Sequence, residues 1–247
     1  MKAVQDHIER KQQDFGKHAF FQRLSRTTVL GEILPFPSML TFWVLTFQDV
    51  LQINARKICD PDLARMARSH MAEDAGHDRW FLNDLLAIDG AHPDVSRLFG
   101  KDHRTVRHVS YDLMAEVYRE QSDIERIVML EALESSSHIF FEKIVAFFEA
   151  HGVQNALKYF GRQHLDAENS HEMFDMEMEA TIAQTILGSG ERNACIQLVD
   201  RCYQAFHTIF DELESTLAEQ AGALSCEAIQ ARETHLKSRE RAYANAA

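Results

Sequence analysis

The chain has 247 residues, of which 38 are acidic and 26 are basic, so its formal net charge at pH 7 is −12. This acidity argues against nucleic acid or an anionic membrane surface as a partner. Four cysteines without C-x2-C spacing match neither a zinc knuckle nor a disulfide framework. The N-terminal stretch has no apolar signal core, and the apolar run at 39–47 is too short to cross a bilayer. We therefore expect a cytoplasmic protein with reduced thiols.

The scarcity of chain breakers favours long helices, because only 10 glycines and 4 prolines occur. Residues 3–26 are predicted to form one or two polar helices. The apolar segment 31–57 begins with two prolines, so its helix is expected from about Ser38. Residues 60–90 are predicted to form one continuous helix, bounded by an aspartate N-cap and a terminal glycine.

The second half of the chain also shows helical patterns, and no segment alternates with the period of a strand. The expected helices are a short piece near 94–100, then 104–120, 122–150, a helix from about 154 to 187 that Gly161 can interrupt, 191–222 and 226–244. The sequence thus predicts an all-α fold of roughly seven to nine helices packed as a bundle. It forms a single domain over 1–247, with a core at roughly 17–222 and a C-terminal helix at 226–244.

Three predicted helices each concentrate histidine with acidic residues. The stretches are HMAEDAGH at 70–77, LEALESSSH at 130–138 and HLDAENSH at 164–171. In the third stretch the spacing H-x3-E-x2-H places both histidines and the glutamate on one stripe of a helix. In the first, His70, Glu73, Asp74 and His77 can share a face. In the second, Glu134 lies in an otherwise apolar run.

An inward-facing carboxylate needs a compensating positive charge, because burial removes its hydration. No lysine or arginine lies one turn from Glu134. Divalent metal ions shared by all three stretches solve this problem, and mixed imidazole and carboxylate ligation suits iron or manganese better than structural zinc. The alternative is that these acidic clusters are solvated helix faces, since 13 histidines make chance clustering common.

The motif set resembles the haem-oxygenase-like di-iron oxidases and oxygenases, also called iron-containing redox enzymes. The likeness covers roughly residues 17–175, through KHAFFQRL, EDAGHDRWFLNDLLAI, ALESSSH and HLDAENSHEM. It implies the helical fold of haem oxygenase, two Fe(II) ions, O2 as co-substrate, a small organic substrate and a homodimer. The iron ligands that it implies are His77, Glu134, His164, Glu168 and His171. Family members usually carry aspartate where this chain has Glu168.

The sixth implied ligand belongs to the first motif, where the chain departs from the family pattern. The family's carboxylate stands either three residues before the histidine, which is Asp74 here, or seven before it, where this chain has His70. The full set of candidate metal ligands is Glu73, Asp74, His77, Glu134, His164, Glu168 and His171.

Other classes of protein remain open at the level of sequence. A ferritin-like di-iron or iron-storage protein needs two E-x-x-H motifs, of which Glu168 with His171 supplies one. A haem-binding or haem-degrading protein needs an axial histidine, for which His18 is the candidate. A thiaminase-like thiol enzyme is disfavoured, since no cysteine sits beside a cluster. If the three clusters of histidine and acidic residues are solvated, the protein is instead expected to be a binding module that needs no metal.

Overall fold

The computed structural model describes residues 1–170, 182–223 and 226–244, and all regular structure in these ranges is helical, which confirms the predicted all-α bundle. The elements are α1 (Lys2–Phe15), α2 (Ala19–Arg26), α3 (Phe36–Met39), α4 (Thr41–Lys57), α5 (Pro61–Glu73), α6 (His77–Asp89), α7 (Val95–Leu98), α8 (Arg104–Arg119), α9 (Asp123–Ala150), α10 (Arg162–Ser170), α12 (Ser189–Ala223) and α13 (Cys226–Ala244), with short 3-10 turns η1 (Leu30–Glu32) and η2 (Lys101–His103).

Helix α9 runs through the centre of the bundle. It begins with a capping box, in which Ser122 accepts from the Glu125 backbone N–H and the Glu125 carboxylate accepts in return. Its buried side chains continue from Ile127 to Phe148 around the whole helix, as expected of a helix covered on all sides. Helices α1, α4, α5, α10 and α12 pack against it.

A cluster of aromatic rings joins α1 and α2 to the long helix α12. Phe15 and Phe210 meet edge to face with ring centroids 4.9 Å apart. At the same junction His18 accepts from the Phe20 backbone N–H through Nδ1, so its Nε2 carries the proton that it donates to Asp211 at 3.1 Å. With both ring nitrogens engaged, His18 is not poised to ligate a haem.

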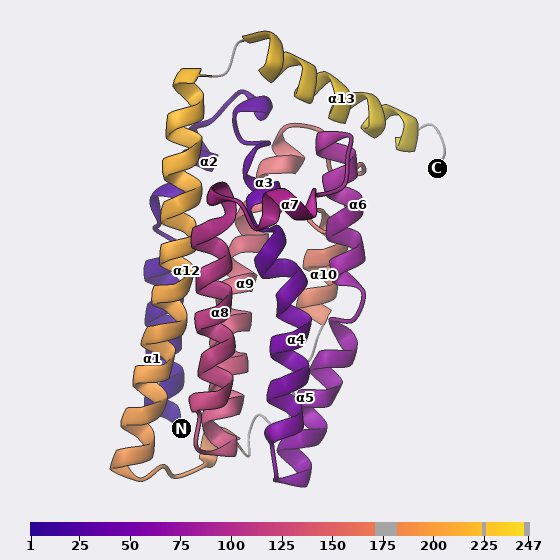
Figure 1. Cartoon of the computed structure of the whole chain (residues 1–247). Coiled ribbons are helices and arrows are strands. Elements are labelled where there is room, and N and C mark those ends of the chain that lie inside the picture. The colour runs from indigo at the N-terminus through magenta and orange to yellow at the C-terminus, as the bar shows by residue number, and fades with distance from the viewer. Residues whose placement is uncertain (171–181, 224–225, 245–247) are drawn as a thin grey trace.

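The C-terminal helix α13 crosses the end of the bundle (Figure 1) and packs on α6 and η1. Its backbone lies directly on Gly31, where any side chain would collide with the Ile229 carbonyl. Farther along, the Glu240 carboxylate accepts from the Ala156 backbone N–H at 2.6 Å and from the Asn155 side chain. Helix α13 is therefore tied to two distant parts of the fold.

Two predicted helix boundaries are wrong. Residues 60–90 form two helices rather than one, because Gly76 adopts φ +98° between α5 and α6. The helix expected from 154 begins instead at Arg162. Between residues 154 and 162, backbone N–H groups donate to side chains of other helices. Ala156 donates to Glu240 and Lys158 donates to Asp84, so these groups do not form helical hydrogen bonds.

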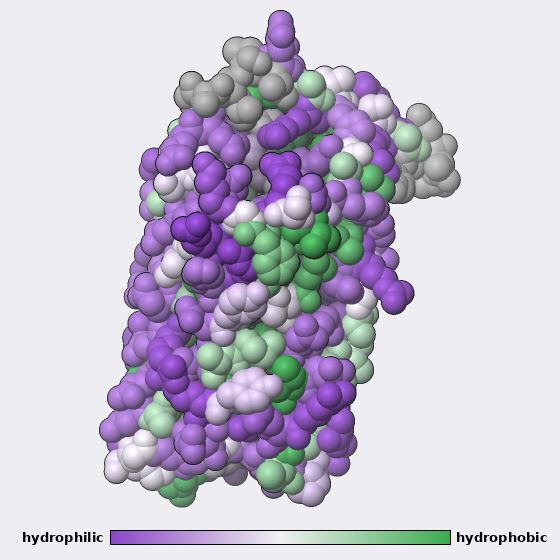
Figure 2. Space-filling view, in the orientation of Figure 1, coloured by the Kyte–Doolittle hydropathy of each residue, from purple (hydrophilic) through white to green (hydrophobic). Residues whose placement is uncertain are grey.

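Figure 2 shows a mostly hydrophilic face with hydrophobic side chains gathered in a band over α7 and α8. Large exposed side chains on these two elements include Val95 and Phe99, at α7, and Tyr111 of α8. No single helix in the described ranges is long and apolar enough to cross a bilayer, although Leu30–Met39 and Thr41–Lys57 together, bent by 44°, reach the required length and composition.

A buried carboxylate just before α9 makes stability depend on pH. Glu120 lies 3.3 Å from Arg126 with its side chain only 2% exposed, and burial raises its pKa to about 8. The folded state then holds a proton that the unfolded state releases above pH ~4.5, so stability falls as pH rises from there through 8. Between pH 5 and pH 9 we expect the free energy of unfolding of the unaltered protein to fall by about 2–4 kcal/mol because of Glu120. The Glu120→Gln variant should not show this fall.

Urea unfolding of both proteins at pH 5 and pH 9 measures this difference. The control is Glu142→Gln, whose side chain is 50% exposed. If the Glu120 variant and the unaltered protein lose stability in parallel, Glu120 ionises normally and another group is responsible.

Candidate metal centre

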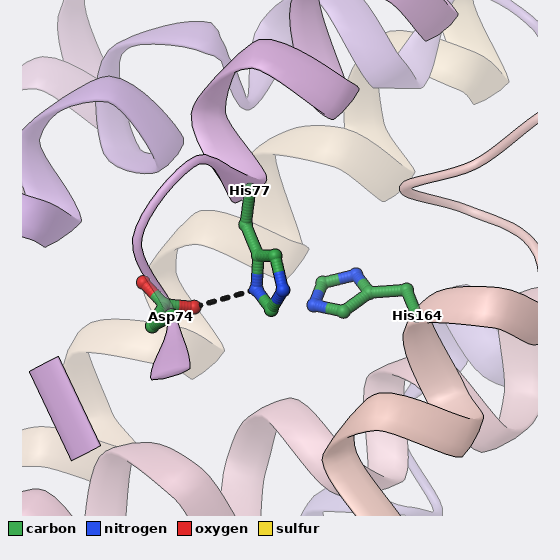
Figure 3. Close-up of side chains that lie close together, drawn as sticks. All are labelled: Asp74, His77 and His164. Carbon is green, nitrogen blue, oxygen red and sulfur yellow. Dashed lines mark hydrogen bonds and ion pairs between the residues drawn. The ribbon is translucent and has the colours of Figure 1, made fainter. Parts of the chain in front are cut away.

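Three buried side chains from separate segments converge on one point (Figure 3). They are Asp74 at the end of α5, His77 at the start of α6 and His164 in the first turn of α10. One ligand atom from each lies within 4.8 Å of the others. Their exposed fractions are 7%, 5% and 1%, so the cluster is closed to bulk water.

The break between α5 and α6 brings Asp74 and His77 together. The Asp74 backbone N–H still donates to the His70 carbonyl at the end of α5, and α6 starts after Gly76. In this turn Asp74 Oδ1 lies 2.8 Å from His77 Nδ1. Gln48 of α4 donates from Nε2 to the Asp74 carbonyl at 2.9 Å and to the second carboxylate oxygen, Oδ2. The carboxylate is thus held from two sides.

Hydrogen bonds fix the tautomers of both histidines. The Tyr159 carbonyl can only accept, so His164 Nδ1, at 2.8 Å from it, carries the proton. His77 Nδ1 likewise donates to the Asp74 carboxylate. In a neutral imidazole the lone pair then resides on Nε2, the usual arrangement of a metal-binding histidine. Asp74 can serve as a ligand or as the carboxylate that orients His77.

Aromatic rings enclose the two imidazoles. The His77 and His164 ring centroids lie 4.2 Å apart, and Phe141 of α9 lies 4.0 Å from His164. Trp80 lies 4.5 Å from His77 on the other side, with the Lys158 ammonium 3.9 Å from the indole centroid. This packing restricts ring rotation and keeps the nitrogens aimed at one another.

A second buried acid, Asp84, supports the site from behind. Its carboxylate accepts the backbone N–H groups of Lys158 at 2.8 Å and Phe160 at 2.9 Å. These two residues flank Tyr159, whose carbonyl orients His164. Burial raises the pKa of Asp84 to about 7, against the opposing effect of these hydrogen bonds. Asp84 was not among the residues predicted from the sequence, although an acid in the apolar stretch FLNDLLAI is a usable signal.

Glu134 lines the same cavity as the three converging residues, as the sequence predicts. Its Oε1 lies 2.9 Å from Nε2 of His70, which comes from α5 and is 2% exposed. A protonated His70 balances the charge of Glu134 without a metal. This partner could not be predicted from residues one turn away on α9, because His70 comes from another helix.

The remaining candidates fall outside the described cluster. Glu73 is exposed on α5, where it accepts from the Ser69 hydroxyl at 3.3 Å. His138 is 41% exposed and lies 3.9 Å from Glu142, away from the cavity. The side chain of Glu168 and the whole of His171 lie outside the described residues.

The cavity beside the cluster adjoins a second, apolar one. Each has a volume of about 30 Å3, enough for one or two small molecules the size of water or O2. Both are lined by Trp43, Phe141 and Tyr159. Val44 and Ser137 also line both, so aromatic and small side chains together separate the polar centre from the apolar pocket.

No known protein-family model matches the chain, and no curated protein matches it significantly. Membership of the haem-oxygenase-like family stays a prediction.

The turn at Gly76 offers a test of how the site is assembled. A Cβ there would meet no atom within 4 Å, so only the φ of +98° opposes a side chain. We expect Gly76→Ala to lower stability by about 1–2 kcal/mol and to weaken metal binding, because relaxing this turn separates Asp74 from His77. Thermal unfolding and a metal titration measure the two effects. Gly188→Ala, also in open space but without a positive φ, is the control.

Proposed function

We propose that this protein is a metal-dependent oxidoreductase that uses O2 to oxidise a small organic molecule, with iron as the metal. The observation that carries the proposal is the convergence of Asp74, His77 and His164, with Nδ1 of both histidines held by acceptors. Two imidazoles and one carboxylate, with open positions beside them, suit Fe(II) in oxygen-using enzymes. The described cluster contains no thiolate, which structural zinc favours.

The residues present fit a metal ion at this point. His77 and His164 would bind it through Nε2, and Asp74 would supply the carboxylate. The sequence resemblance also implies a second Fe(II), with Glu134, Glu168 and His171 as further iron ligands, and manganese is the alternative metal. Bound iron supplies the one-electron chemistry that lets O2 react with an organic substrate.

The chain's own contribution is to exclude water and to admit small apolar molecules. The three ligands are nearly fully buried, and aromatic and small side chains separate them from the neighbouring apolar cavity. At about 30 Å3 that cavity accommodates O2 but not an organic substrate. A substrate must therefore displace side chains such as Phe141 or Trp43 to reach the centre.

We place the enzyme in the cytoplasm, as a homodimer, without nucleic-acid or membrane partners.

One observation favours a second candidate, a centre with a single metal ion. His70 Nε2 lies 2.9 Å from Glu134, and a protonated His70 would balance the carboxylate without a second cation. The two candidates differ in stoichiometry, with two metal ions per chain in the first and one in the second.

Anaerobic titration with Fe(II), followed by oxygen-electrode measurements, tests the proposal. We expect one or two tightly bound ions per chain and consumption of O2 that requires them. The exposed variant His138→Ala should behave like the unaltered protein. Iron binding no stronger than that of an unrelated acidic protein, or oxygen uptake independent of bound metal, would contradict the proposal.

A further inference from the structure

A larger cavity, of about 420 Å3, lies between Arg232 of α13 and the segment from the end of α6 to η2. Its walls come from α13, the end of α6, α7, η2 and the residues around the start of α4. This volume falls within the range of small-molecule sites. It is separate from the candidate metal centre, because His77 and Asp89 occupy opposite ends of α6, roughly 18 Å apart at 1.5 Å per residue.

Arg232 of α13 lines this cavity with an unsatisfied donor. Its Nη1 is buried and has no hydrogen-bond partner in the described part of the chain. Buried guanidinium nitrogens without an acceptor are rare and unfavourable, so water or a ligand is expected to supply one. Arg97 of α7 lines the same cavity and forms no ion pair with the described residues.

Two aspartates, Asp89 and Asp94, line the same cavity, so the formal charges of its arginines and aspartates sum to zero. Asp94 caps α7, and its Oδ1 accepts from the backbone N–H and the hydroxyl of Ser96. Asp89 makes no ion pair with either arginine in the described structure, and burial raises its pKa although both guanidinium groups oppose that effect. Because neither aspartate forms an ion pair with Arg97 or Arg232 in the described ranges, both guanidinium groups can bind an anion.

His103 adds a second buried polar atom without a partner. The residue is 9% exposed, lines the cavity, and its Nδ1 has no hydrogen-bond partner in the described ranges. Burial lowers the pKa of His103, and its ring also bonds the Met39 carbonyl. A neutral ring that donates to this carbonyl offers its other nitrogen as an acceptor. The wall therefore presents donors from arginine and an acceptor from histidine.

We propose that this cavity is a second binding site, for a small molecule that carries an oxyanion and a neighbouring hydroxyl or amino group. The guanidinium groups of Arg232 and Arg97 bind the carboxylate or phosphate, and Nδ1 of His103 accepts from the hydroxyl or amino group. Helix α13 completes the site, since its position is fixed by Gly31 and by the bonds of Glu240.

Isothermal titration of the full chain with inorganic phosphate, succinate and malate tests the proposal, with sodium chloride at equal ionic strength as the blank. We expect saturable binding of phosphate or of a dicarboxylate. Whichever of the two binds more tightly identifies the oxyanion as a phosphate or a carboxylate. Arg232→Gln should weaken that binding by about tenfold or more. Arg97→Gln, on the exposed α7, should do the same without disturbing the fold.

Arg241→Gln is the matched control, because it removes the same charge from an exposed position on α13. It should bind the probes as the unaltered protein does, and all variants should bind Fe(II) equally. Malate should bind more tightly than succinate, since only malate has a hydroxyl for His103. The proposal is overturned if no probe saturates at about 10 mM, or if Arg232→Gln leaves the affinity unchanged. Equal affinity for malate and succinate removes His103 from the contacts.

Discussion

Replacing His164 by asparagine is expected to abolish tight iron binding while the protein stays folded. The asparagine side chain is short, but its amide N–H can replace His164 Nδ1 as the donor to the Tyr159 carbonyl. It offers no nitrogen lone pair at the position of Nε2. A metal that loses one of its imidazole ligands loses about a hundredfold or more in affinity. Anaerobic Fe(II) titration with a metal-sensitive dye measures the change.

His164→Ala serves as the harsher companion variant. It also removes the ring that packs 4.0 Å from Phe141, so it should lose stability as well as iron. Comparing the two variants separates ligation from packing: equal loss of iron with unequal loss of stability is the expected pattern. If His164→Asn binds iron as tightly as the unaltered protein, the imidazole is not a ligand and the proposed centre is wrong.

The helices were largely predictable because their causes are local. Few glycines and prolines, the capping box at Ser122 and the apolar runs of α9 and α12 each act within one segment. The break at Gly76 was not predicted, because a glycine inside a helical pattern is compatible with either outcome. In the broken form Asp74 contacts His77 within the turn and Gln48 of α4, and the second of these partners is too distant in sequence to be found from the pattern.

The candidate site was partly predictable for the same reason. Spacing within each stretch indicated Asp74, His77 and His164, and the apolar surroundings indicated Glu134. The structure brings these four to one cavity. Partners from other helices could not be found this way: Gln48 holds Asp74 from α4, and His70 pairs with Glu134 across two helices. Helical spacing predicts only which residues of the same helix are neighbours.

Asp84→Ala is expected to destabilise the protein by about 2–4 kcal/mol and to weaken iron binding by about tenfold. The substitution removes the acceptor for the backbone N–H groups of Lys158 and Phe160, and a buried donor without a partner is costly. The segment between them carries the Tyr159 carbonyl, which fixes the tautomer and direction of His164. Urea unfolding and Fe(II) titration measure the two effects.

Asp84→Asn provides the internal control, because its carbonyl oxygen can still accept one of the two backbone hydrogens. It should recover part of both the stability and the affinity. Asp112→Ala, an exposed acid on α8, controls for the loss of negative charge. Since Asp84 touches no candidate ligand directly, weaker iron binding in its variants has to pass through the orientation of His164. Unchanged affinity in a destabilised Asp84→Ala protein would show instead that aromatic packing alone aims the imidazole.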